Sequence, residues 1–281
     1  ILKFIKLNLL GIDFEDWYHI ELVQKYFNPK NPESKIVLGI DKILNLLEKN
    51  DTYATFFMVG DLLIKEPKLL DKIIDAGHEI AFHTMHHSRI DTSMKKEMFE
   101  DEIKLFSELT SGKSKGFRAP SFSLNNSSSW IFDILEKYDY LYDSSVLPAK
   151  TRLYGLPNAE KKPFKISSRS IEKNDPNGIL HEFPLLTTQI LGKTFPASGG
   201  FYLRFFPNRI IENAILKNEK NKIPSSFYIH SWELTPEFMP KLNMPLIDHF
   251  ITYHNLSKTF GRIENLIKKF EFSSFERFMK F

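Results

Sequence analysis

Residues 53–82, YATFFMVGDLLIKEPKLLDKIIDAGHEIAF, decide the fold class. The stretch begins with a compact β-rich run, Tyr53–Val59, and ends with a second short apolar run, Glu79–Phe82. Between the two runs, apolar residues recur at the spacing of an amphipathic helix: Leu62, Leu63, Leu69, Leu70, Ile73 and Ile74. Gly77 stands where a helix of this kind is usually capped. The stretch therefore predicts two strands joined by a helix, which is the repeating unit of a parallel sheet.

The same alternation extends to both sides of this unit. Strands are predicted at 7–14, near 116, at 141–146 and at 227–230, and helices at 36–47, 93–109, 130–137, 208–217 and 260–270. The pattern breaks between about Pro148 and Pro207, where Pro, Gly, Asn and Lys accumulate around a short apolar run, Ile179–Leu185. We predict an α/β fold built on a parallel sheet or barrel, as a single domain over residues 1–281 with an insertion around 148–207.

Composition excludes several classes of function. The chain has no cysteine, which rules out disulfides, thiolate zinc sites and cysteine nucleophiles. The net charge of +3 is spread among interspersed acidic and basic residues, so nucleic acid is not expected as a partner. No apolar run has the length of a transmembrane helix, and no signal peptide is visible. These observations favour the cytoplasm, with the periplasm as the alternative if a leader has been removed; they do not bear on the oligomeric state.

Polar clusters follow the predicted strands, at the strand ends where barrel enzymes place their chemistry. Asp13, Glu15 and Asp16 follow the first strand. Clustered carboxylates repel one another, so this cluster indicates a bound cation or a carboxyl group of raised pKa, although an acidic turn would have the same composition. His83 and His87 follow Phe82, and a spacing of four brings two imidazoles to one side of a helical turn, as a metal site requires.

Two further segments contribute polar groups. Arg118 stands two residues before Pro120, whose ring stiffens the chain and can hold the guanidinium as a carboxylate partner. His230 ends an apolar strand, and Trp232 beside it could stack on a sugar face or belong to the core. Two histidines and one carboxylate form a ligand set that leaves positions open for water and substrate. Hydrolysis of an amide also needs a base, an oxyanion stabiliser and an acid, and the chain offers a candidate for each.

Five motifs carry a resemblance to a known family: GIDFEDWYH, GHEIAFHTMHH, FRAPSFS, LYDSSV and YIHSWEL. They occur in the order of the motifs of the NodB-like polysaccharide deacetylases (carbohydrate esterase family 4), and the resemblance spans Leu9 to Glu233. The chain looks closest to the branch associated with exopolysaccharide biosynthesis, whose opening motif resembles V-D-V-E-D-Y-F. The HEFPL run at His181 and the SGGFYLRFFP run at Ser198 also resemble that branch.

The resemblance implies a deformed, incomplete (β/α) barrel and one divalent metal ion, zinc in type. It maps the metal ligands onto Asp16, His83 and His87. It maps the base onto Glu15, where the family usually has Asp, and makes Arg118 the residue that orients this base.

The remaining motifs imply the acid and the substrate contacts. His230 matches the general acid. Asp143 matches a motif near the substrate groove, and Pro120 and Trp232 fall in motifs that border the substrate. Asp13 is the rival base, because alternate residues of a strand share a side. In that alternative register Asp13 is the base and Glu15 is a metal ligand.

The function implied is hydrolysis of the N-acetyl group of an amino sugar in a polysaccharide or glycan intermediate, with release of acetate. One alternative is another amide hydrolase on the same scaffold, such as a sugar deformylase. A second is a carbohydrate-binding homologue that has lost catalysis, an alternative that the unusual Glu15 keeps open.

Overall fold

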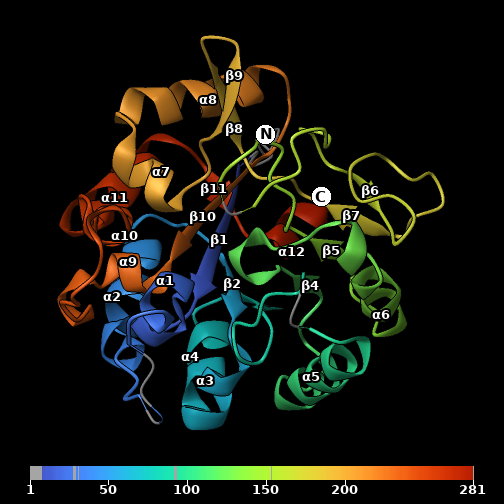
Figure 1. Cartoon of the computed structure of the whole chain (residues 1–281), viewed down its shortest axis with the longest axis horizontal. Helices are drawn as coiled ribbons and strands as arrows, with labels where there is room; N and C mark the ends of the chain where they lie inside the picture. Colours follow the sequence, from blue (N-terminus) through green and yellow to red (C-terminus); the bar gives the residue numbers. More distant parts are fainter. Residues whose placement is uncertain (1–7, 28–29, 31, 92–93, 153, 281) are drawn as a thin grey trace.

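The computed structural model describes residues 8–27, 30, 32–91, 94–152 and 154–280. Within these residues, the centre of the molecule is a nine-stranded sheet that curls upon itself, with helices packed around its outside (Figure 1). The strands of this sheet are β1 (Asn8–Phe14), β2 (Thr55–Met58), β3 (Glu79–Phe82), β4 (Gly116–Phe117), β5 (Tyr142–Asp143), β6 (Phe164–Ile166), β7 (Leu180–Glu182), β10 (Ser225–His230) and β11 (Phe272–Ser273). A separate hairpin pairs β8 (Thr187–Ile190) with β9 (Lys193–Pro196).

The α-helices follow the strands in the alternation that the sequence predicts. They are α1 (Glu21–Gln24), α2 (Ile36–Lys49), α3 (Gly60–Lys65), α4 (Lys68–Asp75), α5 (Lys96–Leu109), α6 (Ile131–Lys137), α7 (Gly200–Phe205), α8 (Asn208–Lys220), α9 (Ser231–Leu234), α10 (Leu246–Tyr253), α11 (Thr259–Lys269) and α12 (Phe275–Met279). Short 3₁₀ turns include Trp17–His19 and Pro120–Phe122. Among the described residues, no helix is both long and apolar enough to cross a bilayer.

The order of the strands is β10-β1-β2-β3-β4-β5-β7-β6, and β11 pairs with β1 beside β10. All pairings along this order are parallel except that of β6 with β7. Among the described residues, β6 does not pair with β10, and only isolated bridges, Leu185 with Ser226 and Gly199 with Tyr228, join the chain after β7 to β10, so no continuous ladder closes the barrel. The predicted α/β fold, a deformed and incomplete (β/α) barrel, is therefore confirmed.

Strand β1 runs through the middle of the sheet, and all seven of its residues are buried. Because side chains alternate along a strand, Leu10, Ile12 and Phe14 pack into the core under the helices, while Leu9 packs with Phe57 inside the barrel. The alternation places Asp13 on the interior side as well, at the end of the strand.

The structure differs from the predicted elements in two places. The helix predicted over 62–74 is two helices, α3 and α4, because Pro67 lacks an amide donor and forces Glu66 out of the helical region (φ −135°, ψ 69°). In the segment 148–207, β6 and β7 extend the main sheet, whereas β8 and β9 stand apart from it. Leu7 and Ser93, at the starts of two predicted elements, lie outside the described residues.

Candidate active site

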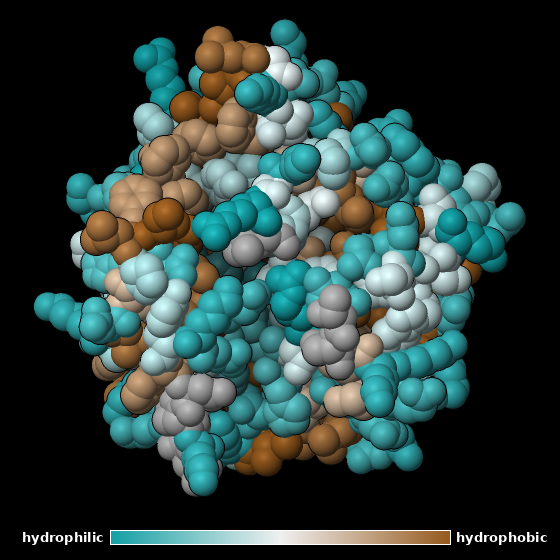
Figure 2. Space-filling view, in the orientation of Figure 1, coloured by the Kyte–Doolittle hydropathy of each residue, from teal (hydrophilic) through white to brown (hydrophobic). Residues whose placement is uncertain are grey.

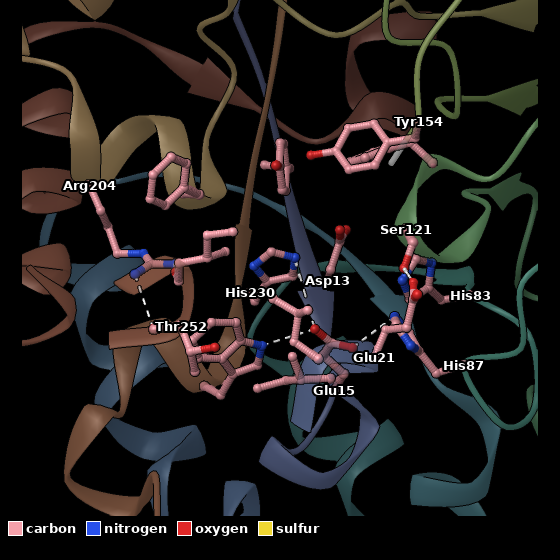
Figure 3. A pocket seen from close by; sticks show the side chains of 17 residues that line it. Asp13, Glu15, Glu21, His83, His87, Ser121, Tyr154, Arg204, His230 and Thr252 are labelled. Carbon is pink, nitrogen blue, oxygen red and sulfur yellow. Dashed lines mark hydrogen bonds and ion pairs between the residues drawn. The ribbon is translucent and has the colours of Figure 1, made fainter. Parts of the chain in front are cut away.

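A cavity lies at the carboxyl ends of the parallel strands, where barrel enzymes hold their catalytic groups. Its walls come from both halves of the chain, and Figure 3 shows their polar side chains converging on one space. The lining residues are Asp13, Glu15, Ile20, Glu21, Leu22, His83, His87, Ser121, Phe122, Tyr154, Phe201, Arg204, Tyr228, His230, Trp232, Ile251 and Thr252.

Asp13 forms a buried ion pair with Arg118. The Nη1 atom of Arg118 lies 2.6 Å from Oδ1 of Asp13, and neither side chain is more than 3% exposed. Arg118 also donates from Nε to the carbonyl of Ser144 and from Nη2 to its hydroxyl, both at 3.0 Å. A Cβ at Gly11 would lie 2.5 Å from Nη1 of Arg118, so glycine is what allows the guanidinium to cross β1. The pair fixes one carboxylate of the predicted cluster toward the cavity.

Glu15 lies between an imidazole and an indole. Its Oε2 is 2.8 Å from Nε2 of His87, and its Oε1 accepts a hydrogen bond of 2.9 Å from Nε1 of Trp232. The backbone N–H of Glu15 donates to the Ser231 hydroxyl, which in turn donates to the carbonyl of Glu15. These contacts tie the end of β1 to α9 and hold the carboxylate in one orientation.

His83 is held by the strand next to it. Its Nδ1–H donates to the carbonyl of Arg118 at 2.7 Å, and its ring lies 5.1 Å from that of His87, centroid to centroid. Burial lowers the pKa of His83 to about 4. Burial alone would raise the pKa of Glu15, but the imidazoles around it, foremost His87, outweigh burial and hold that pKa below its usual range.

The structure does not bring Asp16 together with His83 and His87. Asp16 Oδ1 accepts from the N–H of Trp17 at 2.8 Å, while Oδ2 accepts from the Ser34 hydroxyl and from the N–H groups of residues 35 and 36 at 2.8, 2.6 and 3.0 Å. The carboxylate thus caps a 3₁₀ turn and the start of α2, as acidic residues commonly do at helix starts, and it does not line the cavity.

His230, the last residue of β10, lines the cavity, and its imidazole is held by Glu233, which does not line the cavity. Its Nδ1 lies 2.8 Å from Oε2 of Glu233, its Nε2 lies 3.9 Å from Oε1 of Glu15, and its side chain is 23% exposed. Burial would lower the pKa of His230, but Glu233, followed by Glu15 and Asp13, outweighs burial and raises it to about 9. The imidazole is therefore disposed to carry a proton toward the cavity.

Asp143 and Pro120 do not line the cavity, contrary to the expectation that they border the substrate. Asp143 is completely buried and stands opposite Glu182 in the pairing of β5 with β7. Burial, followed by the neighbouring carboxylate of Asp143, raises the pKa of Glu182 well above its usual value. Pro120 is buried at the start of its 3₁₀ turn, and Ser121 and Phe122 line the cavity in its place.

Two functional candidates escaped the sequence analysis, Glu233 and Arg204. Glu233 stands three residues after His230, the spacing at which side chains of a helical turn meet, so this pair could have been found. Arg204 is 2% exposed and donates from Nε to Oε1 of Glu233 at 2.7 Å. A charged residue in the apolar run 201–206 is the only sequence sign of this contact.

The chemistry of the donors fits a divalent metal. Glu15, His83 and His87 offer a carboxylate oxygen and two imidazole nitrogens, and the His83 Nδ1 hydrogen bond is the kind that orients a metal-binding histidine. The buried Oε2 of Glu15 has no hydrogen bond among the described residues, only its ion-pair contact. No three such side chains in the described ranges already converge as a metal site. Glu15 and His87 touch, and donors on a tetrahedral zinc lie roughly 3.3 Å apart, so admitting an ion requires a small separation.

Comparisons with known proteins cover most of the chain. Residues 37–141 match the polysaccharide deacetylase family, and residues 144–280 match a domain of unknown function, DUF3473. The peptidoglycan deacetylase-like protein FGM2 of Gibberella zeae is 27% identical over 124 residues, which are 42% of this chain and 36% of that protein. A peptidoglycan-N-acetylglucosamine deacetylase of Bacillus cereus is 32% identical over 87 residues, 30% of this chain and 41% of that one.

The fold has a counterpart among solved structures. A candidate polysaccharide deacetylase from Mycobacterium smegmatis superposes with a TM-score of 0.55 at 14% identity, covering 100% of this chain and 92% of that one. The matched regions span well under two thirds of the length of the two relatives named above. His83, His87 and Arg118 fall inside the deacetylase match, and His230 falls inside the second match. The order of the motifs and the family match together show that this chain contains a polysaccharide deacetylase domain, matched over residues 37–141.

Proposed function

We propose that this chain is a metal-dependent N-deacetylase that hydrolyses the acetamido group of an amino sugar in a polysaccharide or glycan intermediate. The observation that carries the proposal is the convergence of two oriented groups on one cavity: Asp13, held by Arg118 at 2.6 Å, and His230, held by Glu233 at 2.8 Å. One group can accept a proton and the other can donate one, as amide hydrolysis requires.

The contacts favour the alternative register of the acidic cluster. Glu15 faces His83 and His87, whereas the oxygens of Asp16 are occupied by backbone and hydroxyl donors. The metal ligands proposed are therefore Glu15, His83 and His87, with Asp13 as the base. A bound divalent ion, zinc by the chemistry of this donor set, would polarise the acyl carbonyl and lower the pKa of the attacking water.

The side chains of the protein then divide the proton transfers between them. Asp13 accepts the proton of the attacking water, and Arg118 keeps its carboxylate turned toward the cavity. As the C–N bond breaks, His230 donates its Nε2 proton to the departing amine. The products are acetate and a free amino sugar. Removing one such acid or base typically costs about 10²- to 10⁴-fold in rate.

The carrier of the amino sugar is proposed from the surroundings of the cavity. Tyr154, Phe201 and Trp232 offer apolar faces of the kind that stack on sugar rings. The two relatives described above are named for peptidoglycan, and the opening motif resembles the exopolysaccharide branch. These likenesses support a polymer, or a precursor of one, that contains N-acetylated amino sugars.

Acetate release from a panel of N-acetylated oligosaccharides, with the metal content of the protein measured, tests the proposal. The metal-loaded protein should release acetate from at least one glycan, and Asp13→Asn should retain metal but lose at least about 10²-fold in rate. Formate release from N-formyl sugars without acetate release would favour a sugar deformylase. Glycan binding with no acyl release would favour a carbohydrate-binding protein without catalysis.

A further inference from the structure

Arg204 is a buried cation whose bonds connect two walls of the cavity. It is 2% exposed, and its Nε donates to Glu233 at 2.7 Å. Its Nη1 donates to the carbonyls of Thr252 and His254 at 3.1 and 2.9 Å, and its Nη2 donates to the carbonyl of Ile251 at 2.9 Å. Three of these contacts are with carbonyls at the carboxyl end of α10, which have no partner within the helix, so a cation there is favourable.

Glu233 receives bonds from both sides. One carboxylate oxygen faces Arg204, and the other accepts from Nδ1 of His230 at 2.8 Å and from its backbone N–H at 3.2 Å. Glu233 is fully buried and does not line the cavity, so it cannot touch a substrate. Its fixed carboxylate decides which edge of the imidazole faces outward.

We infer that Glu233 and Arg204 are positioning residues for catalysis: together they hold the His230 ring with Nε2 toward the cavity and fix the α10 wall at Ile251 and Thr252 against the same support. This inference rests on the proposed function, since His230 acts there as the acid. It assigns a role to two residues in the region that matches a domain of unknown function. Figure 3 shows Arg204 and His230 on one side of the cavity, with Thr252 joined to Arg204.

The other contacts of His230 constrain its ring less specifically than Glu233 does. The ring stacks on Trp232, with centroids 5.3 Å apart and planes at 16°, and it meets Tyr228 edge-on at 5.3 Å. These ring contacts fix the plane of the imidazole but would tolerate a half-turn about the Cβ–Cγ bond, which exchanges Nδ1 with Cδ2 and Nε2 with Cε1. Among the described residues, the charge-assisted bond of 2.8 Å to Glu233 holds the Nδ1 edge, whereas the contact of Nε2 with Glu15 is longer, at 3.9 Å.

The test uses the dependence of the rate on the leaving group, which a purely structural role would not change. An amine must be protonated as it leaves, whereas the 4-nitrophenolate of 4-nitrophenyl acetate leaves without an acid. In the metal-loaded full chain, Glu233→Gln should lower kcat for N-deacetylation by roughly 10- to 100-fold. KM and the rate of hydrolysis of the aryl ester should stay within about threefold. Glu233→Asp, which keeps the charge, should lose less.

The same comparison of amide and ester hydrolysis applies to a variant of Arg204. Arg204→Lys keeps a buried positive charge but loses the planar guanidinium that binds Glu233 and the carbonyls of α10 at the same time. It should therefore show the same selective loss of amide turnover. The matched control is Arg262→Lys, because Arg262 donates to the carbonyls of Arg204 and Phe206 without reaching Glu233. This control should keep the wild-type ratio of amide to ester hydrolysis.

Two outcomes would overturn the inference. One is an equal loss of amide and ester hydrolysis in Glu233→Gln, which would indicate a general loss of structure or metal. The other is unchanged amide turnover. A crystal structure of Glu233→Ala gives a readout without activity, and there the His230 Nε2 should move away from its place 3.9 Å from Glu15. If the wild type cleaves no N-acetyl sugar, the proposed function fails, while an unmoved ring would refute the positioning role by itself.

Discussion

Glu79 lies at the amino end of β3, at the opposite end of the barrel from the cavity, and its replacement by glutamine should change how stability depends on pH. Its carboxyl group is buried and accepts hydrogen bonds from the Thr55 hydroxyl, from the Tyr142 hydroxyl at 2.6 Å and from the N–H of Glu276 at 2.9 Å. No Lys or Arg side chain pairs with Glu79 in the part of the chain that the structure describes. Burial therefore dominates and raises the pKa of Glu79 from its usual value of 4.5 to about 7.

The magnitude follows from that difference. A folded state that holds a proton more tightly than the unfolded chain is stabilised below the unfolded pKa, and it loses this stability as pH rises through the folded pKa. At about 1.4 kcal/mol per pH unit, the step from 4.5 to about 7 corresponds to roughly 3 kcal/mol. Glu79→Gln cannot ionise, so this part of the pH dependence should vanish in the variant.

Urea unfolding followed by circular dichroism would measure the effect as a difference between wild type and variant, in which other titrating groups cancel. Between about pH 4 and about pH 8.5, the free energy of unfolding of Glu79→Gln should gain roughly 3 kcal/mol relative to wild type. Glu264→Gln is a control, since that carboxylate is 37% exposed and pairs with Lys268 on the same helix. A difference that stays within about 0.5 kcal/mol over this range would refute the reasoning.

Three further predictions concern the cavity and the acidic cluster beside it. In metal analysis, Glu15→Gln should lose bound zinc, whereas Asp16→Asn should retain it. In urea unfolding, Asp16→Asn should lose about 1 kcal/mol of stability because its helix caps are weakened; loss of zinc from Asp16→Asn but not from Glu15→Gln would make Asp16 the ligand. His230→Ala should retain metal and lose about 10²- to 10⁴-fold in deacetylation rate, and near-normal turnover would remove it as the acid. Trp232→Phe keeps an aromatic ring but loses the 2.9 Å hydrogen bond to Glu15. The zinc affinity, measured by competition with a chelator, should therefore fall by about tenfold or more; an unchanged affinity would show that the indole does not support the ligand.

The fold was accessible from the sequence because buried strands and amphipathic helices leave periodic patterns. The run 53–59 and the helical spacing of 36–47 are such patterns, and both elements exist. Strand β11 has two residues and leaves no pattern, and its place beside β1 depends on contacts more than 260 residues away in sequence. Pro67 lies within the segment predicted as one helix, but the apolar residues on both sides of it keep the spacing of a single helix.

The residues of the candidate site could be largely predicted from the sequence, but the role of each carboxylate could not. The letters Asp13, Glu15 and Asp16 do not say which carboxylates share a side once the strand ends. The structure separates them through partners that are distant in the chain: Arg118 takes Asp13, and the amides at the start of α2 take Asp16. The bond between Arg204 and Glu233 is likewise a tertiary contact, which no local pattern encodes.

The position of β1 between β2 and β10 also has a consequence for how the chain folds. Asn8 pairs with Ser225, more than two hundred residues later, so during synthesis one edge of β1 has no neighbour until β10 has left the ribosome. Pairings of such sequence separation fold slowly, and an unpaired apolar strand edge is a site of aggregation while it waits. Production of this protein should therefore depend on slow synthesis, low temperature or chaperones more than its final stability would suggest, and truncations that remove β10 should yield insoluble chains.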